Sequence, residues 1–201
     1  MRAPALAFIL VAAAFAAAPF WEDKAPADWT EEQLRKLLTD SPWAQPAVSA
    51  KQASGAVVYL CGAHPMREAE AESKRRAELK RPPKPVEDPT AEEYADFLEE
   101  NEGKYIVLAV PAPDPRVFKD PAEVRRIEEE CILKIGKKKY KMTGHFPPSP
   151  SDKWLRLVFP RVVTEADKSF RFELYIPSIA DPYRFAEFQV KDLVFKGRLE
   201  L

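Results

Sequence analysis

Hydrophobic residues recur along the chain in two patterns, one typical of strands and the other typical of helices. Residues 170–176 alternate between hydrophobic and polar side chains, which is the period of two expected of a half-buried strand. Continuous apolar runs predict a buried strand at 56–61 and a central strand at 105–110 that is covered on both faces, and another strand is predicted at 154–159. The last stretch, 185–201, predicts one or two further strands.

Helix signals occur earlier in the chain. Thr30 and Gln33 form the pattern of a capping box before a short helix, which Pro42 ends. Three more helices are predicted at 65–80, after a second capping box at Thr90 and Glu93, and after a start signal at Asp120. Helices therefore gather in the N-terminal two thirds and strands in the last third, which predicts an α+β fold with a mixed, largely antiparallel sheet.

The amino terminus has the layout of a secretory signal peptide. A basic start is followed by an uncharged apolar run at 3–16, and Ala14 and Ala16 fit the small-x-small cleavage pattern with the cut before Ala17. The run is shorter than the roughly 18–20 residues that span a bilayer. We therefore expect a signal peptide at 1–16, an N-terminal segment with a short docking helix at 17–54, and a single α+β domain without a transmembrane span at 55–201.

The charges of the chain nearly balance, since 31 basic and 32 acidic residues give a net charge of −1. This balance gives no support to nucleic-acid binding. Two histidines, two cysteines and six glycines leave few ways to build a metal cluster, a phosphate-binding loop or a redox pair. We therefore predict no cofactor, no metal site and no catalytic residue, and the signal peptide indicates a location in the periplasm or the extracellular medium.

Four stretches carry a signature that extends over most of the chain after residue 16: WTEEQLRKLLTDSPW at 29–43, VVYLCGAHPMREA at 57–69, LVFPR at 157–161 and FQVKDLVFKGRLEL at 188–201. Together they resemble a family of uncharacterised secreted bacterial proteins. The resemblance implies export and a shared fold, but no activity, catalytic residues or cofactor. The two cysteines and the prolines after Arg81 depart from the family's usual pattern, so any disulfide would be particular to this chain.

The two cysteines are the first candidates for chemistry. In an oxidising compartment their even count predicts a disulfide between Cys61 and Cys131, closing a loop of about 70 residues that corresponds to roughly 4 kcal/mol of stabilisation by chain entropy. The alternative is a secreted hydrolase in which Cys61 and His64, with His145, supply a thiolate and a base. Their spacing is nonspecific, and the order of the four residues matches no compact zinc site.

Acidic and aromatic residues suggest two further functions. A hydrolase acting on glycosides needs two facing carboxylates. Acidic residues cluster at 99–100 and 128–130. Adjacent acidic residues at this charge density usually form a solvated face. Trp21, Trp29 and Trp43 could form a stacking platform for sugar rings if they are exposed and coplanar. We expect instead that these large side chains dock the short N-terminal helix onto the main domain.

One concentrated charge cluster lies in a predicted hairpin. Strands are expected at 131–135 and 140–143, with a turn at Gly136 and Lys137. The cluster around this turn consists of Lys134, Lys137, Lys138, Lys139, Tyr140 and Lys141. Lysines at a strand edge can simply discourage pairing with other strands. The functional alternative is contact with an anionic envelope partner, such as a lipid headgroup, an acidic glycan or an acidic protein face.

The sequence as a whole favours an exported, non-enzymatic structural or binding protein of the cell envelope. A secreted hydrolase and a carbohydrate-binding module are the alternatives from different classes. A concave site with converging polar groups would favour the hydrolase. Exposed, coplanar tryptophan rings would favour the carbohydrate-binding module.

Overall fold

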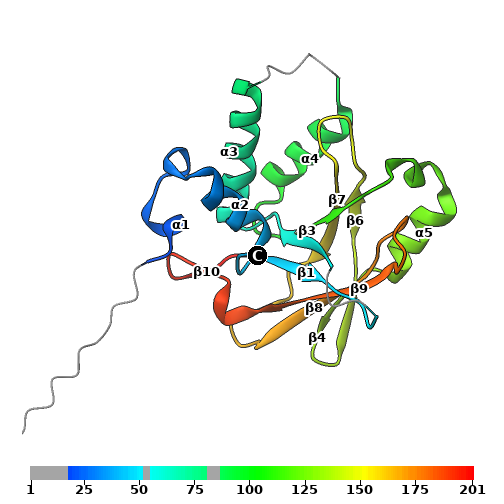
Figure 1. Ribbon diagram of the computed structural model, residues 1–201. Helices are drawn as coiled ribbons and strands as arrows, with labels where there is room; N and C mark the ends of the chain where they lie inside the picture. The colour runs from blue at the N-terminus through cyan, green and yellow to red at the C-terminus, as the bar shows by residue number, and fades with distance from the viewer. Residues whose placement is uncertain (1–17, 52–54, 81–86) are drawn as a thin grey trace, which may run out of the picture.

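The computed structural model describes residues 18–51, 55–80 and 87–201 (Figure 1). The predicted signal peptide at 1–16 and the prolines at 82–85 lie outside these ranges. Within them the chain forms antiparallel sheets with helices around them, which confirms the predicted α+β fold. None of the helices in these ranges is both long and apolar enough to cross a membrane.

The larger sheet has five strands in the order β1-β2-β3-β7-β6, and all neighbours in it are antiparallel. Its strands are β1 (Ala44–Ala47), β2 (Ala56–Leu60), β3 (Tyr105–Pro111), β6 (Gly144–Phe146) and β7 (Trp154–Pro160). The sequence predicts β2, β3 and β7 but not the two outermost strands. β1 contains Pro46, which a strand tolerates at a sheet edge, and β6 is too short to show an alternating pattern.

The smaller sheet has four strands in the order β5-β4-β8-β9, also antiparallel. Its strands are β4 (Ile132–Ile135), β5 (Lys138–Lys141), β8 (Ser169–Tyr175) and β9 (Tyr183–Gln189). The predicted hairpin is confirmed as β4 and β5, although β5 begins at Lys138, two residues before the predicted start at 140. The alternating segment forms β8. A two-stranded ribbon follows, made of β10 (Val194–Phe195) and β11 (Arg198–Leu199).

The two sheets pack on a common hydrophobic core. Phe159 of β7 and Phe172 of β8 lie with ring centroids 4.9 Å apart, and both belong to one cluster of buried side chains. At one edge Val48 and Phe185 exchange backbone hydrogen bonds of 2.9 and 2.8 Å, which join the end of β1 to β9. At the other edge the chain passes directly from β5 into β6. Burial of this apolar surface is the main contribution to stability.

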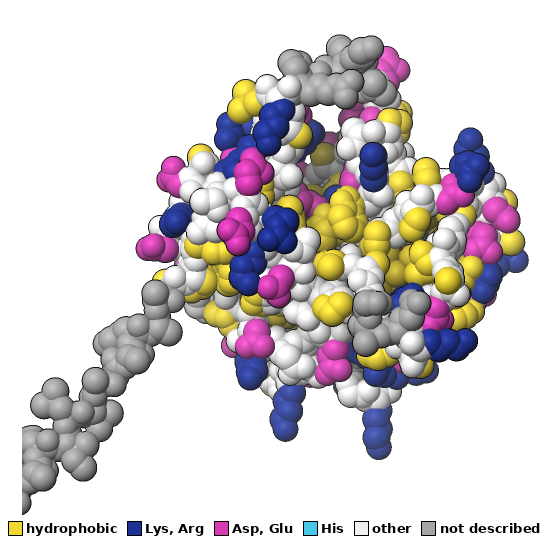
Figure 2. All heavy atoms as spheres, in the orientation of Figure 1, with side chains coloured by type: hydrophobic (Ala, Val, Ile, Leu, Met, Phe, Trp, Pro, Cys, Tyr) yellow, Lys and Arg dark blue, Asp and Glu magenta, His cyan; other side chains and the backbone are white. Residues whose placement is uncertain are grey.

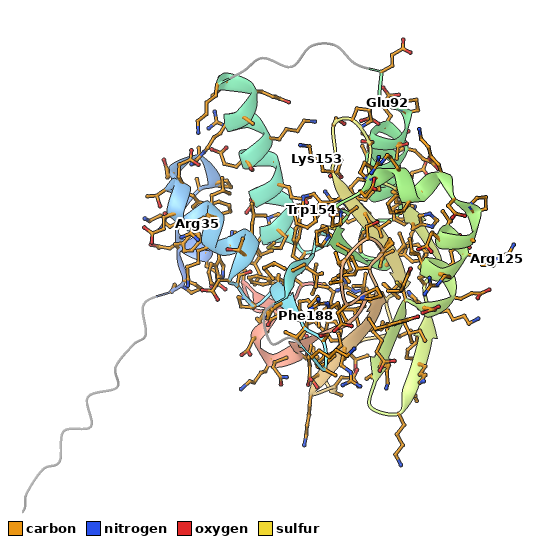
Figure 3. The ribbon with its side chains drawn as sticks, turned by 45° about the vertical axis from the view of Figure 1, so that its right-hand side comes forward. Arg35, Glu92, Arg125, Lys153, Trp154 and Phe188 are labelled. Carbon is orange, nitrogen blue, oxygen red and sulfur yellow. The ribbon has the colours of Figure 1, made fainter. Side chains whose placement is uncertain are left out.

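Helices surround the sheets. They are α1 (Phe20–Asp23), η1 (Pro26–Asp28), α2 (Glu31–Thr39), α3 (His64–Lys80), α4 (Pro89–Glu100), η2 (Pro115–Lys119), α5 (Pro121–Glu130) and η3 (Val190–Asp192). The predicted capping box of α2 is confirmed, because the side chains of Thr30 and Gln33 each accept a hydrogen bond from the other's backbone N–H. Figure 3 shows Phe188 of β9 inside the molecule, whereas Arg35 on α2 and Arg125 on α5 project outward.

The start of α4 differs from the prediction. The capping box expected at Thr90 and Glu93 is wrong, because Asp88 is the capping residue and accepts a hydrogen bond from the Ala91 N–H at 3.1 Å. Pro89 explains the earlier start, since proline lacks an N–H and its fixed φ fits the first position of a helix. Helix α4 therefore begins at Pro89, and Thr90 lies within its first turn.

Candidate functional site

The basic hairpin, defined as Lys134, Lys137, Lys138, Lys139, Tyr140 and Lys141, is formed by β4 and β5. Gly136 has a φ of +56°, the positive value that a two-residue hairpin turn needs at its first central position. The register pairs Ile135 with Lys138 and Leu133 with Tyr140. Leu133 is fully buried, and the half-buried Tyr140 packs against the core. The hairpin is therefore anchored on its inner side, and its lysines other than Lys134 extend into solvent.

Most of the hairpin's positive charge is unbalanced. Within the hairpin, the exposed lysines that form no ion pair with any described residue are Lys137, Lys138, Lys139 and Lys141. Lys134 lies 2.9 Å from Glu173, which also lies 3.2 Å from Arg171. The hydrogen bond from Lys134 lowers the pKa of Glu173, and the charges of Lys134, Arg171 and Lys139 lower it further. Figure 2 shows basic side chains projecting from the lower end of the molecule, where the hairpin lies in Figure 1.

A groove of about 630 Å³ lies beside the basic hairpin. One wall is formed by residues 135–138 and Tyr140, and the other is part of the segment 162–169 that leads from β7 into β8. Lys168 adds an exposed cation to this second wall. Asp167 also lines the groove, but its carboxylate accepts hydrogen bonds of 2.9 Å from both the N–H and the hydroxyl of Thr164. The groove therefore combines several free ammonium groups with a carboxylate that is already engaged.

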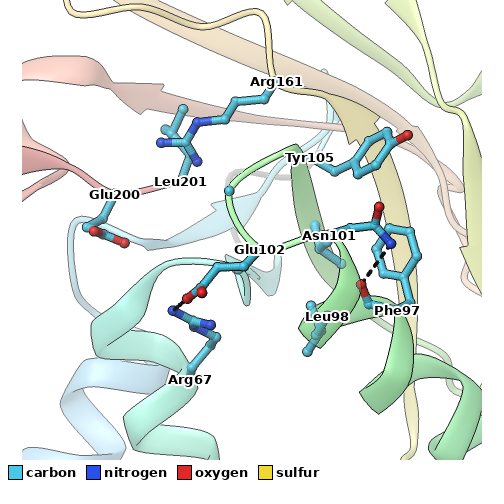
Figure 4. Close-up of a pocket in the computed structure, with 12 residues that line it drawn as sticks. Arg67, Phe97, Leu98, Asn101, Glu102, Tyr105, Arg161, Glu200 and Leu201 are labelled. Atoms are coloured by element: carbon cyan, nitrogen blue, oxygen red, sulfur yellow. Dashed lines mark hydrogen bonds and ion pairs between the residues drawn. The ribbon is translucent and has the colours of Figure 1, made fainter.

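A smaller pocket of about 140 Å³ lies between the start of α3 and the end of α4, as Figure 4 shows. Arg67 lies 2.8 Å from Glu102, and Arg161 donates a hydrogen bond to the Leu199 carbonyl at 3.2 Å. Both cations of this pocket thus have partners in its own surroundings. It was not predicted, because its residues come from parts of the sequence that only the fold brings together.

The predicted disulfide between Cys61 and Cys131 is wrong, since both residues are free, buried thiols. Cys61 follows β2, and its Sγ donates to the Val107 carbonyl at 3.2 Å and accepts a hydrogen bond from the Tyr94 hydroxyl of α4 at 3.4 Å. Cys131 precedes β4, and its Sγ donates to the Tyr175 carbonyl at 3.8 Å. The two thiols therefore lie beside different sheets and face different neighbours. The even cysteine count, on which the predicted disulfide rested, carries no information about where in the fold each cysteine lies.

The geometry gives little support to a hydrolase based on Cys61 and His64. Burial raises the pKa of the Cys61 thiol, which disfavours the thiolate that a nucleophile needs. His64 Nε2 lies 3.3 Å from Glu68, its neighbour on α3, while His145 Nδ1 lies 3.7 Å from Glu128 on α5. In the part of the chain that the structure describes, no three potential metal ligands are grouped together.

The acidic clusters are dispersed, and the tryptophans are largely buried. The acidic residues at 99–100 and 128–130 lie on different helices, α4 and α5. Trp29 and Trp43 are 2% and 0% exposed, and Trp21 meets Trp43 edge-on at an interplanar angle of 84°. These three rings therefore do not form the exposed, coplanar surface that a sugar-binding platform requires. They pack into or against the core, in agreement with the predicted docking role.

A buried ion network that the sequence does not predict lies between the helices and the five-stranded sheet. Arg156 of β7 is 5% exposed, and its guanidinium lies 2.6 Å from Glu70 on α3 and 2.8 Å from Asp152. Tyr94 of α4 places its ring 5.1 Å from the same guanidinium, and the Tyr59 hydroxyl donates to Glu70. The network connects α3 and α4 to the sheet, and its charged groups are paired with one another. We interpret it as structural.

Comparisons with known proteins point to no function, because no protein family, curated protein or solved structure matches the chain. The basic hairpin and the groove beside it are therefore the features from which a function is inferred.

Proposed function

We propose that this protein is an exported, non-enzymatic binding protein of the cell envelope and that its basic hairpin contacts an anionic partner. The observation that carries this proposal is that four exposed lysines without an ion-pair partner among the described residues cluster on one hairpin: Lys137, Lys138, Lys139 and Lys141. The signal-peptide pattern at 1–16 and the resemblance to secreted bacterial proteins support export to the periplasm or the extracellular medium.

The chemistry of the hairpin suits a partner that carries phosphate, sulfate or carboxylate groups. Each lysine close to an anionic surface contributes about 1 kcal/mol to binding. Lysine ammonium groups are point charges on flexible stems, so they respond to charge density rather than to one fixed shape. Lys168 on the opposite wall of the groove adds a further positive charge beside the hairpin. Tyr140 adds an aromatic ring and a hydroxyl to the groove lining. Lipid headgroups, acidic glycans and acidic protein faces all meet these requirements.

Other features of the molecule give less support to an enzyme. The buried Cys61 thiol has a raised pKa, and the arginines of the smaller pocket, Arg67 and Arg161, are engaged by Glu102 and the Leu199 carbonyl. A binding role needs only accessible charge, which the hairpin supplies. We therefore favour binding over hydrolysis.

The test is co-sedimentation of the protein with vesicles that contain phosphatidylglycerol and with the acidic glycan polygalacturonate. The hairpin variant changes Lys137, Lys138 and Lys139 to serine. A matched control changes three exposed lysines outside the hairpin, Lys74, Lys119 and Lys153, to serine and therefore removes the same net charge. We expect binding of at least one probe by the wild type and the control, and weak binding by the hairpin variant. Equal binding by all three proteins, or binding by none, would contradict the proposal.

A further inference from the structure

Strand β5 has one backbone edge that pairs with no other strand in the part of the chain that the structure describes. In a hairpin with a two-residue turn, the pair that flanks the turn is hydrogen-bonded and the pairs then alternate. Ile135 and Lys138 flank the turn, so Lys138 and Tyr140 direct their backbone groups toward β4. Lys139 and Lys141 direct theirs to the opposite side. Among the described residues, no backbone hydrogen bond joins that side of β5 to another segment.

The groove of about 630 Å³ begins at this strand. Its lining residues on β5 are Lys138 and Tyr140, and its opposite wall is the segment 162–169, which forms no backbone hydrogen bond with β5 among the described residues. The side chains of Ile135, Tyr140 and Val162 supply apolar surface within it. An extended chain placed there could bond to the free backbone groups of β5 and bury alternate side chains against this surface.

The charges at this edge decide which strands can pair with it. A second copy of β5 would bring its own lysines against Lys139 and Lys141, and like charges on adjacent strands destabilise the pairing. A segment rich in Glu or Asp would instead form cross-strand ion pairs with the same side chains. The lysines thus disfavour pairing with a second copy of β5 and favour pairing with an acidic strand, so charge selects between the two partners.

We propose that the outer edge of β5 binds an extended, acidic polypeptide segment of another protein as an added strand. This inference rests on the proposed function and narrows its anionic partner to a polypeptide. Because Lys139 and Lys141 place their side chains on one face of β5 and Lys138 and Tyr140 on the other, the segment that fits best alternates acidic and apolar residues. The acidic residues face Lys139 and Lys141, and the apolar residues face the apolar part of the groove formed by Ile135, Tyr140 and Val162.

The probe is a fluorescent seven-residue peptide of alternating glutamate and valine, and its control is the same peptide methylated on every backbone nitrogen. Both peptides carry the same charges, but the methylated one cannot donate backbone hydrogen bonds. We expect the unmodified peptide to bind the full chain at least about tenfold more tightly than the methylated one, because added-strand affinity comes mainly from backbone bonds. The variant with Lys139→Ser and Lys141→Ser should bind the unmodified peptide more weakly, and the Lys74, Lys119 and Lys153 control variant should not.

Amide hydrogen exchange supplies a second readout, with an internal control in the same strand. Exchange at the Lys139 and Lys141 amides should slow when the peptide is added, whereas the Lys138 and Tyr140 amides are already bonded to β4 and should change little. Equal binding of both peptides, or no peptide binding by a protein that binds vesicles or polygalacturonate, would overturn this inference and leave the proposed function standing. Failure to bind any anionic probe would overturn both.

Discussion

The ion network around Arg156 and the basic hairpin both contain positive charge, but they arrange it in opposite ways. Arg156 is buried, and its guanidinium is bonded to Glu70 and Asp152. Lys137 and Lys139 are exposed and form no ion pair with any residue that the structure describes. A buried charge that loses its partner is costly, whereas a solvated lysine can be changed at little cost. The first region therefore holds the fold together, and the second is free to bind.

The largest expected difference between the buried and exposed regions is in chemical accessibility. Cys61 and Cys131 are buried, and burial raises the pKa of Cys131 to about 12. We expect both thiols to react with a thiol-labelling reagent at least about a thousandfold more slowly in the native protein than in the unfolded one, because reaction requires opening of a stable core. Mass spectrometry should find two labels per chain after unfolding without a reductant. No label under those conditions would mean that a disulfide is present after all.

Loss of the buried Arg156 guanidinium should have the next largest effect, which is on the free energy of unfolding. We expect Arg156→Met to lower the free energy of unfolding by about 2–4 kcal/mol, less than for a wholly buried pair, because the carboxylates left behind are partly exposed. Urea unfolding would measure the change. The matched control is Arg171→Met, which removes an arginine from a more exposed strand position and should cost less than about 1 kcal/mol. Similar losses of unfolding free energy in the two variants would mean that the buried Arg156 contributes no more to stability than an exposed arginine does.

A smaller effect should appear in the pH dependence of stability. Hydrogen bonds from Ser149 and Ser151 hold the pKa of Asp88 well below its ordinary value. A carboxylate with a lowered pKa in the folded state stabilises the protein above its unfolded pKa, and that contribution is lost as the pH falls through the folded value. Below about pH 4, wild-type stability should therefore decline more steeply than that of Asp88→Asn. If the free energies of unfolding of the two proteins declined in parallel as the pH falls, these hydrogen bonds would not favour the ionised form of Asp88.

The smallest expected effect on stability belongs to the hairpin itself. Changing Lys137, Lys138 and Lys139 to serine should alter the free energy of unfolding by no more than about 0.5 kcal/mol, because these side chains are exposed and form no ion pair with described residues. Thermal and urea unfolding would measure the change. A loss above about 1 kcal/mol would mean that the lysines support the fold, and any binding defect of this variant would then be uninformative.

The hairpin was predictable from the sequence, while the groove and the ion network were not. Gly136 and the flanking apolar residues are local signals for a two-residue turn between strands. The second wall of the groove comes from 162–169, which reaches the hairpin only because β8 pairs with β4. Glu70 and Arg156 are 86 positions apart. Their contact depends on how α3 packs on the sheet, and neither residue differs in the sequence from the many other charged residues.

The most direct test of the central claim is the salt dependence of binding to one anionic probe. Polygalacturonate affinity would be measured between about 50 and 500 mM salt for the wild type, the hairpin variant and the Lys74, Lys119 and Lys153 control, because screening by salt is what distinguishes charge-driven binding. We predict that the wild type and the control bind at low salt and lose affinity together as salt increases, while the hairpin variant binds weakly throughout. Superimposable curves for the wild type and the hairpin variant would contradict the assignment of binding to the hairpin.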